Sequence, residues 1–415
     1  MRTRTIAALV ASMSLTPGLA IAQPTVKSLY VTNNVGSPGN LAAFSVDPNG
    51  LLTSLGNYPA GFNPQGVALT PDGRYAVVIN GTISATTEEV FALPLNADGT
   101  AGPSAPPSLY PDGNLSLNIT VDGWIIIPSA LIDGITSSFV NTSGRVQEVD
   151  RAFAGTSPWC VASTPDGRFV YAGGSGSSNL YSFAMNQATG DLTPIGSPQA
   201  STTLFALVAH PTLPILYAST GLQNVIQKYD IQMDGTLVFD DGFPSGATSC
   251  VEFAIHPEAT YLYICHVVSD ALTVVPINPD GTLGASIQTI PIGSDIRDVV
   301  TDGSFVYVTD ESSISGSPVG VIVYKIGPDG LLSQVAPAVM TNGGRPQYMA
   351  LWTPPSVECD GDTNGDNVVN FTDLNTVLAS FGVMGDGLPG DVNGDDVVNF
   401  TDLNIVLANF GNTCG

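Results

Sequence analysis

Short runs of β-branched, aromatic and aliphatic residues recur along most of the chain, and residues that favour tight turns separate them. Runs of three to five such residues are too short for buried helices and are typical of strands. One set lies at residues 29–31, 75–78, 124–127, 169–171, 215–217, 261–264 and 305–308. A second set extends from residues 42–46 to residues 321–326. The pattern predicts an all-β body.

Two kinds of tight turn recur between these runs and set a period. The first is Thr-Pro-Asp-Gly-Arg followed by an aromatic residue, at residues 70–75 and 164–169, with weaker copies at Val121, His210-Pro211, His256-Pro257 and Thr301. Successive copies lie 50, 44, 46, 46 and 44 residues apart. The second is a glycine turn, at Gly50, Gly99, Gly144, Gly190, Gly235, Gly281 and Gly330. Four short strands in each repeat of about 46 residues indicate a propeller blade.

The two ends of the repeat array complement each other. The chain begins with a run in the second-strand position of a blade, at Leu29, whereas the last innermost-strand run, from Tyr348 to Trp352, has no runs after it. Pairing these runs completes a seventh blade and leaves no open sheet edge. The sequence therefore predicts a seven-bladed propeller over residues 24–352. An open stack of sheets or a sandwich is the alternative, and neither explains the complementary ends.

The first 22 residues have the pattern of an export signal. Arg2 and Arg4 precede an apolar run, and residues 20–22 (Ala-Ile-Ala) provide the small residues of a cleavage site. We expect a mature chain from Gln23 that is secreted, extracellular or attached to the cell surface, with the periplasm as an alternative. A retained signal-anchor helix is the other interpretation. No later segment has about 18 uninterrupted apolar residues, so no membrane span is expected in the mature chain.

The charge balance argues against polyanionic partners. The 415 residues include 11 Lys or Arg and 36 Asp or Glu, which gives a formal charge of −25. Nucleic acids and anionic membrane surfaces both require a basic face, so neither is expected as a partner.

The body of the chain, from residue 28 to about residue 352, resembles the lactonase family of seven-bladed propellers, whose named member is 6-phosphogluconolactonase. The resemblance rests on residues 29–33 (Leu-Tyr-Val-Thr-Asn), residues 44–47 (Phe-Ser-Val-Asp) and the Pro-Asp-Gly-Arg turns. It implies a propeller fold and a hydrolase of the carboxylic ester class. The motifs are mostly scaffold signals, so they identify the fold better than the chemistry.

A lactonase needs a cation to stabilise the oxyanion and a general base to activate water. We place four catalytic candidates at the channel mouth: Arg297 and Arg345 as cations, and His266 and Glu252 as bases. The acidic residues expected near them are Asp295, Asp298, Asp310 and Glu311.

Two features argue against hydrolysis. Enzymes of the family tend to show Pro-Arg-His where the innermost strand begins, and here residues 64–65 and 346–347 read Pro-Gln while residues 158–159 read Pro-Trp. His210 and His256 each precede a proline in the same turn of successive repeats, which favours a scaffold role.

A second domain follows a short Pro-rich linker at residues 353–357. Residues 358–415 contain ten acidic residues and no Lys or Arg, and a twelve-residue loop at 362–373 recurs at 391–402.

Oxygen ligands at loop positions 1, 3, 5, 9 and 12, with a backbone carbonyl at position 7, suit Ca²⁺. The predicted ligands of the two ions are Asp362, Asn364, Asp366, the Val368 carbonyl, Asn370 and Asp373, and then Asp391, Asn393, Asp395, the Val397 carbonyl, Asn399 and Asp402. Position 6, usually glycine, is Asn367 or Asp396, and both residue types tolerate positive φ.

A short amphipathic helix is expected behind each loop. The apolar stripes are Leu374, Val377, Leu378 and Phe381, and then Leu403, Val406, Leu407 and Phe410. Two half EF-hands with this spacing resemble the type I dockerin module. That resemblance implies a small α-helical domain that binds a cohesin-type domain of a scaffold or anchor protein.

The resemblance to dockerins also implies which residues contact the partner. Loop positions 10 and 11 are Phe371 and Thr372 in one half, and Phe400 and Thr401 in the other. Better-known dockerins often have a small hydroxyl residue at position 10, so the phenylalanines leave the cohesin type open. The alternative is that both phenylalanines pack inside the module, because an exposed phenylalanine is costly without a partner.

Five cysteines in an exported chain suggest disulfides but leave one unpaired. Cys359 and Cys414 bracket the second domain, and a bond between them would close it. Cys250 and Cys265 lie on neighbouring strands and are candidates for a second bond, which would leave Cys160 free and buried. The alternative is three reduced thiols in the core.

Two functions remain open on the sequence alone. In the first, the propeller is a non-catalytic binding platform, with room for a carbohydrate or small-molecule ligand at its mouth, and the calcium module attaches it to a cohesin-bearing assembly on polysaccharide or at the cell surface. In the second, the docked propeller is a hydrolase that opens a lactone or a sugar-derived ester.

Overall fold

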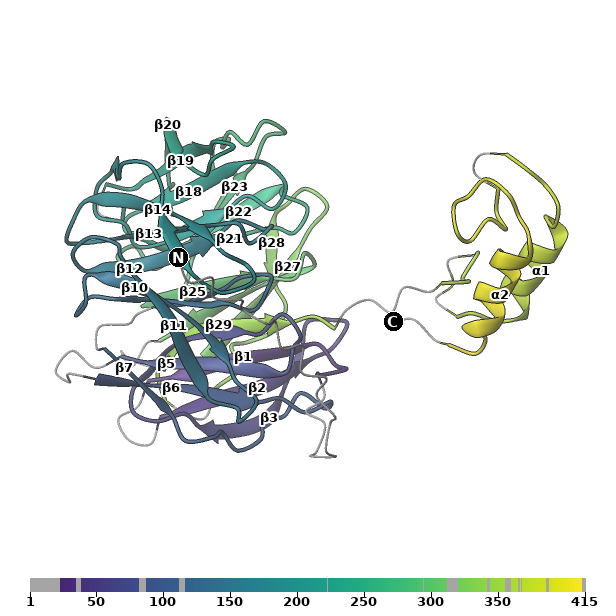
Figure 1. The fold of residues 1–415 in the computed structure, drawn as a ribbon, viewed down its shortest axis with the longest axis horizontal. Helices are drawn as coiled ribbons and strands as arrows, with labels where there is room; N and C mark the ends of the chain where they lie inside the picture. The colour runs from purple at the N-terminus through teal and green to yellow at the C-terminus, as the bar shows by residue number, and fades with distance from the viewer. Residues whose placement is uncertain are drawn as a thin grey trace, which may run out of the picture. The chain divides into compact units, whose positions relative to one another are not determined.

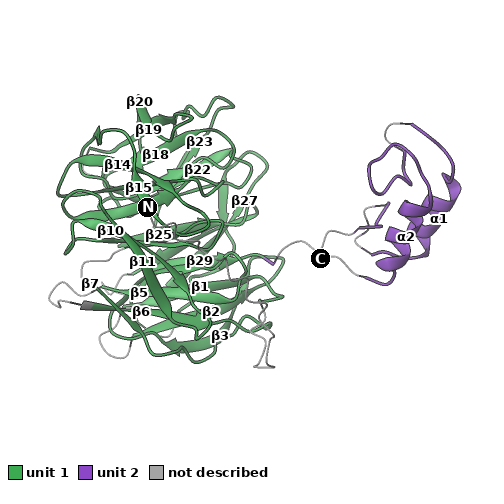
Figure 2. Cartoon of the chain, in the orientation of Figure 1, with its two compact units in different colours: residues 1–353 green, residues 354–415 purple. Residues whose placement is uncertain are grey.

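The computed structural model describes residues 23–34, 39–81, 87–111, 116–221, 223–293, 295–311, 320–341, 344–354, 360–364, 366, 368–385 and 388–412. The proposed export signal and both cysteines of the Cys359–Cys414 pair lie outside these residues. The chain divides into two compact units, residues 1–353 and residues 354–415 (Figure 2). The boundary falls at the start of the linker expected from the sequence.

The first unit contains seven antiparallel sheets, each of which forms one blade (Figure 1). From the innermost strand outwards, blade 1 contains β29 (Pro346–Trp352), β1 (Ser28–Asn33), β2 (Asn40–Val46) and β3 (Leu52–Pro59). Blade 2 contains β4 (Pro64–Leu69), β5 (Tyr75–Asn80), β6 (Thr87–Pro94) and β7 (Ser108–Pro111). Blade 3 contains β8 (Asn118–Ile119), β9 (Ile125–Ser129), β10 (Gly134–Val140) and β11 (Val146–Phe153).

The other four blades repeat this order. Blade 4 contains β12 (Pro158–Ser163), β13 (Phe169–Gly174), β14 (Asn179–Met185) and β15 (Leu192–Pro194), and β16 (Gln199–Ala200) also pairs with β14. Blade 5 contains β17 (Leu207–Ala209), β18 (Ile215–Ser219), β19 (Val225–Ile231) and β20 (Leu237–Pro244). Blade 6 contains β21 (Cys250–Ile255), β22 (Tyr261–His266), β23 (Ala271–Pro276) and β24 (Gln288–Pro291). Blade 7 contains β25 (Ile296–Thr301), β26 (Phe305–Asp310), β27 (Gly320–Ile326) and β28 (Leu332–Gln334). The predicted seven-bladed propeller is confirmed.

Blade 1 is built from both ends of the propeller sequence, as the complementary ends of the repeat array predict. β29 lies antiparallel to β1, with Leu29 opposite Leu351 and Val31 opposite Met349 (Figure 1). The indole N–H of Trp352 also donates a hydrogen bond to the carbonyl of Pro24 at 2.8 Å. The two termini of the propeller are therefore held in one sheet, and no strand edge is left at the join.

Tyrosines on the second strands explain why the glycine turn repeats. The Tyr171 hydroxyl donates to the Gly235 carbonyl at 3.1 Å, and the Tyr217 hydroxyl donates to the Gly281 carbonyl at 2.6 Å. Each bond connects one blade to the outer turn of the next. Both glycines have φ near +80°, which an L side chain rarely adopts. The turn therefore needs glycine, and its carbonyl connects neighbouring blades.

The second unit contains two helices, α1 (Phe371–Ala379) and α2 (Phe400–Ala408). Its core consists of four fully buried valines, Val369, Val377, Val398 and Val406. The two predicted helices are present, but the predicted stripes are only partly buried, because Leu378 and Leu407 are each 51% exposed. No helix among the described residues of either unit is long and apolar enough to cross a membrane.

Candidate functional site

A channel of about 450 Å³ is lined by the innermost strands of all seven blades. Its lining includes Gly66, Ser116, Cys160, Ala206, Glu252, Asp298 and Tyr348, one from each blade. Glu252 and Asp298 are the only charged residues among the described residues that line it. The channel therefore has a charged part on blades 6 and 7.

The backbone of the innermost strands directs these side chains into the channel. Glu252, Asp298 and Tyr348 are each the third residue of their strand, β21, β25 and β29. In each case the pairing register with the second strand shifts at this point. Such a bulge changes the direction in which a side chain points and is often found beside active sites. The same irregularity recurs in β4 and β12, so it is a property of the repeat.

Glu252 and Asp298 interact as a pair of acids in the channel wall. Asp298 is 5% exposed, and its two carboxylate oxygens accept hydrogen bonds from the backbone N–H groups of Met349 (2.6 Å) and Val299 (2.8 Å). Burial raises the pKa of Asp298 to about 7. Burial, and then the negative charge of Asp298, raise the pKa of Glu252 well above its usual range. Because Asp298 accepts two backbone donors, it is the member of the pair that ionises first, and Glu252 keeps its proton longer.

Tyr348 completes the polar side of the channel. Burial and the nearby charges of Glu252 and Asp298 raise the pKa of its phenol. The hydroxyl therefore stays protonated at neutral pH and is available as a hydrogen-bond donor. The sequence indicated Tyr348 only as part of a closing strand and gave no sign of this role.

The two candidate arginines meet at a single carboxylate near the channel. Arg297 donates from Nε to Glu311 at 2.7 Å, and Arg345 forms an ion pair with the other oxygen of Glu311, which is only 3% exposed. Arg297 also lies 3.4 Å from Asp295. The expected grouping of Arg297, Arg345, Asp295 and Glu311 is present. Both arginines are engaged in ion pairs, so neither lies free above the acidic pair.

His266 does not lie at the channel mouth, in contrast to the expectation from sequence. It ends β22 at the expected rim, but it is fully buried in blade 6 and does not line the channel. Burial lowers its pKa to about 4. A neutral, enclosed imidazole at this position has no access to a substrate in the channel.

The other two histidines have the scaffold role that the sequence favours. His210 Nδ1 accepts hydrogen bonds from the backbone of Thr212 and Leu213. His256 Nδ1 accepts one from Glu258, and its Nε2 lies 3.0 Å from the Gly303 carbonyl. Each imidazole therefore stabilises the turn in which it lies.

Residues with a left-handed backbone conformation lie directly before several of the innermost strands. Asn63, Ser157, Ser249 and Asp295 directly precede β4, β12, β21 and β25, and each has a φ between 49° and 63°. The Asp270 carboxylate accepts a hydrogen bond from the Asp295 backbone N–H at 2.6 Å, and Asn224 does the same for Ser249 at 2.7 Å. Non-glycine residues adopt this conformation at a cost, and such strain clusters at functional sites. The rim that carries Arg297 and Arg345 is therefore fixed by contacts between neighbouring blades.

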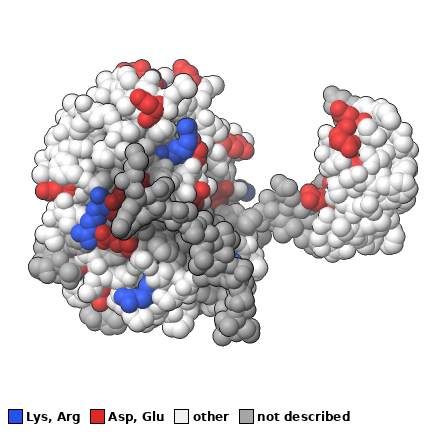
Figure 3. All heavy atoms as spheres, viewed as in Figure 1, with Lys and Arg blue, Asp and Glu red and all other residues white. Residues whose placement is uncertain are grey.

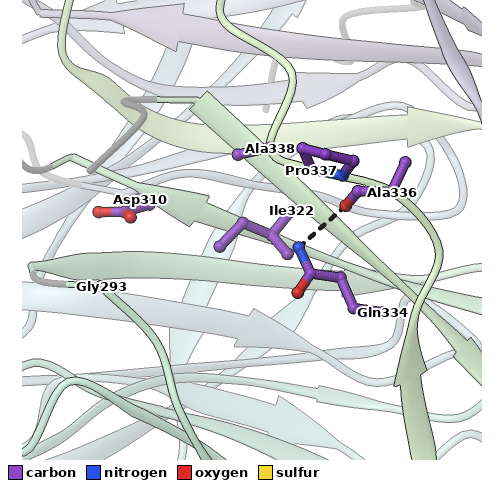
Figure 4. Close-up of a pocket in the computed structure, with 7 residues that line it drawn as sticks. All are labelled: Gly293, Asp310, Ile322, Gln334, Ala336, Pro337 and Ala338. Carbon is purple, nitrogen blue, oxygen red and sulfur yellow. Dashed lines mark hydrogen bonds between the residues drawn. The ribbon is translucent and has the colours of Figure 1, made fainter. Parts of the chain in front are cut away.

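A second depression, of about 600 Å³, lies on blade 7 (Figure 4). Gln334 donates a hydrogen bond to the Ala336 carbonyl at 2.9 Å there, and Asp310 is the only charged residue among the seven described residues that line it. Glu252 and Asp298 do not line it, so we take the axial channel as the candidate site.

The second unit carries two acidic loops. Ligand atoms of Asp362, Asp366 and Asp373 lie within 4.8 Å of one another. The same holds for the equivalent set Asp391, Asp395 and Asp402. No Lys or Arg occurs in residues 358–415 to offset these charges, and on the side of this unit visible in Figure 3 acidic atoms form a patch. Three carboxylates at this separation fit a hard divalent cation.

The remaining predicted ligands have further contacts. Asn370 and Asn399 cap the helices, and each accepts a hydrogen bond from a backbone N–H two residues later. Asp373 and Asp402 are fully buried; burial alone would raise their pKa, but backbone N–H donors outweigh burial and lower it. Asp396 has a φ of 63°, as position 6 requires, whereas Asn367 lies outside the described residues.

The phenylalanines at loop position 10 lie on the surface and do not pack in the core. Phe371 is 68% exposed and Phe400 is 69% exposed. Phe371 packs edge-on against Phe410 with ring centroids 4.9 Å apart, and Phe400 packs in the same way against Phe381 at 5.0 Å. The unit therefore has two similar aromatic pairs on its surface.

The three cysteines of the propeller are free thiols. Cys160, Cys250 and Cys265 are all buried and unpaired. Cys250 and Cys265 do lie on neighbouring strands of blade 6, but Cys250 is opposite His266 and Cys265 is opposite Glu252. The interpretation as reduced core thiols is the correct one.

Comparison with known proteins supports the fold. No family model matches the chain, and no curated protein matches it. A candidate 6-phosphogluconolactonase of Bacteroides uniformis superposes with a TM-score of 0.68 and 15% identity over 79% of this chain and all of its own. The periplasmic gluconolactonase of Pseudomonas aeruginosa gives 0.67 and 16% identity over 80% of this chain and all of its own. At this identity the likeness establishes the seven-bladed propeller fold and leaves the chemistry to be argued from the site.

Proposed function

We propose that the propeller is a hydrolase that opens a lactone in its axial channel, with Glu252 and Asp298 as the acid–base pair. The observation that carries this proposal is the placement of two enclosed acids and one phenol on neighbouring blades of a channel of about 450 Å³, a size that holds a small ligand. The similarity to propellers named as gluconolactonases supports this interpretation over a purely non-catalytic platform.

The pair divides the roles of base and acid. Asp298, stabilised as the carboxylate by two backbone donors, accepts a proton from a water molecule that adds to the lactone carbonyl. The hydroxyl of Tyr348 donates to the oxyanion that forms. The bond from the carbonyl carbon to the ring oxygen then breaks, and Glu252 gives its proton to that oxygen. The product is a hydroxy acid.

The charges of the site favour an uncharged substrate. The ionised Asp298 carboxylate repels a phosphate group, and the charges of Arg297 and Arg345 are offset by Glu311 and Asp295. We therefore propose a neutral lactone and not a phosphorylated one. Arg297 and Arg345 act as positioning residues that hold the rim.

Kinetics on a panel of lactones test this function. Glu252→Gln and Asp298→Asn are expected to lower kcat/KM by about a hundredfold or more, as loss of a general acid or base does. The matched control is Glu258→Gln, because Glu258 is an exposed residue of the same blade, outside the channel. Binding of lactones without turnover would favour the non-catalytic platform. Turnover that is unchanged in both channel variants would show that the acid pair is not the catalytic group.

We also propose that the second unit binds two Ca²⁺ ions and attaches the exported propeller to a cohesin-type domain. The paired carboxylate triads support the first step, and the exposed aromatic pairs at Phe371 and Phe400 support the second. When bound, Ca²⁺ would supply the positive charge that offsets three carboxylates in each loop. The double variant Asp362→Asn with Asp391→Asn is expected to abolish calcium-dependent capture by a cohesin, whereas Asp360→Asn, just outside the first loop, is expected to retain it.

A further inference from the structure

A cavity of about 460 Å³ lies between blades 2 and 3, apart from the axial channel. It is lined by the turn between β4 and β5, the turn between β8 and β9, and the end of β10. Both turns follow innermost strands, whereas Arg297 and Arg345 lie where innermost strands begin, so the cavity is at the other end of the blades. It is therefore separate from the proposed hydrolase site.

Three aromatic side chains line this cavity, those of Tyr75, Trp124 and Phe139. Trp124 and Phe139 pack edge to face with ring centroids 5.9 Å apart. The indole N–H of Trp124 donates to the Gln187 carbonyl at 2.9 Å, and the ring lies so close to Gly190 that a Cβ there would clash with it. The indole is therefore held in place by its own contacts with the protein.

Two carboxylates complete the lining, and none of the ten described lining residues is Lys, Arg or His. Asp72 accepts hydrogen bonds from the Thr70 hydroxyl and the Arg74 backbone N–H, and its Oδ2 lies 3.6 Å from Arg74 Nε, which offsets part of its charge. Asp122 Oδ2 accepts from the neutral side chain of Gln187 at 2.6 Å, a contact that leaves its charge in place. The cavity therefore combines aromatic rings with negative charge.

The next gap around the ring, between blades 3 and 4, is closed by a side chain. Gln187 Nε2 donates there to Asp122 and also to the carbonyl of Asp166 at 2.7 Å. Gln187 is the second residue of the outer turn of blade 4, and the second residue of the equivalent turn in blade 3 is Thr142. Thr142 is exposed, and its side chain is too short to make both contacts. The cavity is therefore a departure from the repeat.

We propose that this cavity binds a small organic ammonium ion whose nitrogen carries methyl groups. Such a cation is attracted to the faces of aromatic rings, most strongly to that of Trp, and nearby carboxylates add to the attraction. A hard metal ion does not fit this lining, because it requires six or more oxygen ligands in place of rings. This inference does not depend on the proposed hydrolysis, because it concerns a different cavity.

Calorimetry on the full-length protein tests the role of the positive charge. The probes are choline and 3,3-dimethyl-1-butanol, which has the same shape but a carbon atom in place of the nitrogen and no charge. Choline is expected to bind about tenfold or more tightly than this neutral analogue. Glycine betaine is expected to bind more weakly than choline, because Asp72 and Asp122 repel its carboxylate. Equal affinities for choline and the neutral analogue, or no saturable binding of choline, would overturn the proposal.

Variants locate the bound cation. Thr142→Gln is expected to abolish choline binding, because the new side chain can close this cavity as Gln187 closes the next gap. Trp124→Leu removes the strongest ring and is expected to weaken choline binding by about tenfold. The matched control is Thr193→Gln, because Thr193 is exposed on β15, outside the cavity, and this variant should keep the wild-type affinity. Choline affinity that is unchanged in both Thr142→Gln and Trp124→Leu would refute this site.

Discussion

Replacement of Glu252 by Gln is expected to stabilise the propeller at neutral pH while it slows the proposed hydrolysis. The acid pair keeps a proton in the folded protein at pH values where the unfolded chain has lost it, because the folded pKa values are raised. Stability is therefore full below about pH 4 and falls as the pH rises through about 7. Gln has nearly the same shape as Glu and does not ionise. The variant therefore does not show the part of the stability loss at rising pH that comes from Glu252.

The size of the effect follows from the proton that Glu252 keeps. Because Glu252 ionises after Asp298, whose pKa is raised to about 7, it stays protonated in the folded protein at pH 7, whereas its ordinary pKa is 4.5. A pKa difference of one corresponds to about 1.4 kcal/mol, which gives a ceiling of about 3 kcal/mol at pH 7. Glu252 is partly exposed to the channel, so water reduces the cost of its charge. We expect Glu252→Gln to gain about 1 to 3 kcal/mol in free energy of unfolding at pH 7, since Glu252 also bears the repulsion of Asp298.

Denaturant unfolding of wild type and variant at intervals from pH 4 to pH 8 measures this gain. The difference between the two proteins should be near zero at pH 4 and should grow steadily towards pH 7. Glu258→Gln, on the surface of the same blade, should show no such growth. A Glu252→Gln variant that is no more stable than wild type at pH 7 would show that the two acids do not share an enclosed site as described.

Four further outcomes are expected. Truncation after Gly343 removes β29 and should cost at least about 5 kcal/mol, which is the stability of a typical domain, whereas truncation after Pro355 should leave propeller melting unchanged. Chelation of calcium should reduce the helical circular dichroism of the second unit, and equal helicity with and without chelator would contradict the calcium proposal. The double variant Phe371→Ser with Phe400→Ser should lose cohesin capture and retain calcium binding in calorimetry. Tyr348→Phe should lower kcat of lactone hydrolysis by about tenfold or more with little change in KM, and an unchanged kcat would exclude the phenol as the oxyanion donor.

The fold is predictable because its signals are local and repeated. The turn glycines need positive φ, and the second strands alternate in a pattern that each repeat copies, so the period is visible without any knowledge of packing. The match between a chain start at Leu29 and a last strand at Tyr348 to Trp352 then sets the number of blades. The pairing of β29 with β1, which lie far apart in the sequence, follows because the first repeat lacks an innermost strand and the last innermost strand has no further strands after it.

The candidate site is predictable only in part, because its geometry depends on bulges that no local motif marks. The sequence predicts Glu252 as a base, but it indicates Asp298 only as a neighbour and Tyr348 only as a strand residue. The sequence does contain a sign that these three residues belong together, because each is the third residue of an innermost strand. His266 shows the converse limit: its predicted position at a strand end is correct, but burial, which removes it from the channel, depends on how blades 5 and 6 pack.

The candidate site lies where the last strand closes the ring, so the site depends on the completion of the fold. The Asp298 carboxylate accepts the backbone N–H of Met349 on the closing strand, and the Thr309 hydroxyl donates to the Gln347 carbonyl at 3.0 Å on the same strand. Glu311 of blade 7 likewise pairs with Arg345, just before that strand. Until β29 joins β1, Asp298 lacks one of its two backbone donors and Tyr348 is absent from the channel. The chain therefore has a complete candidate site only once its last strand has closed the propeller.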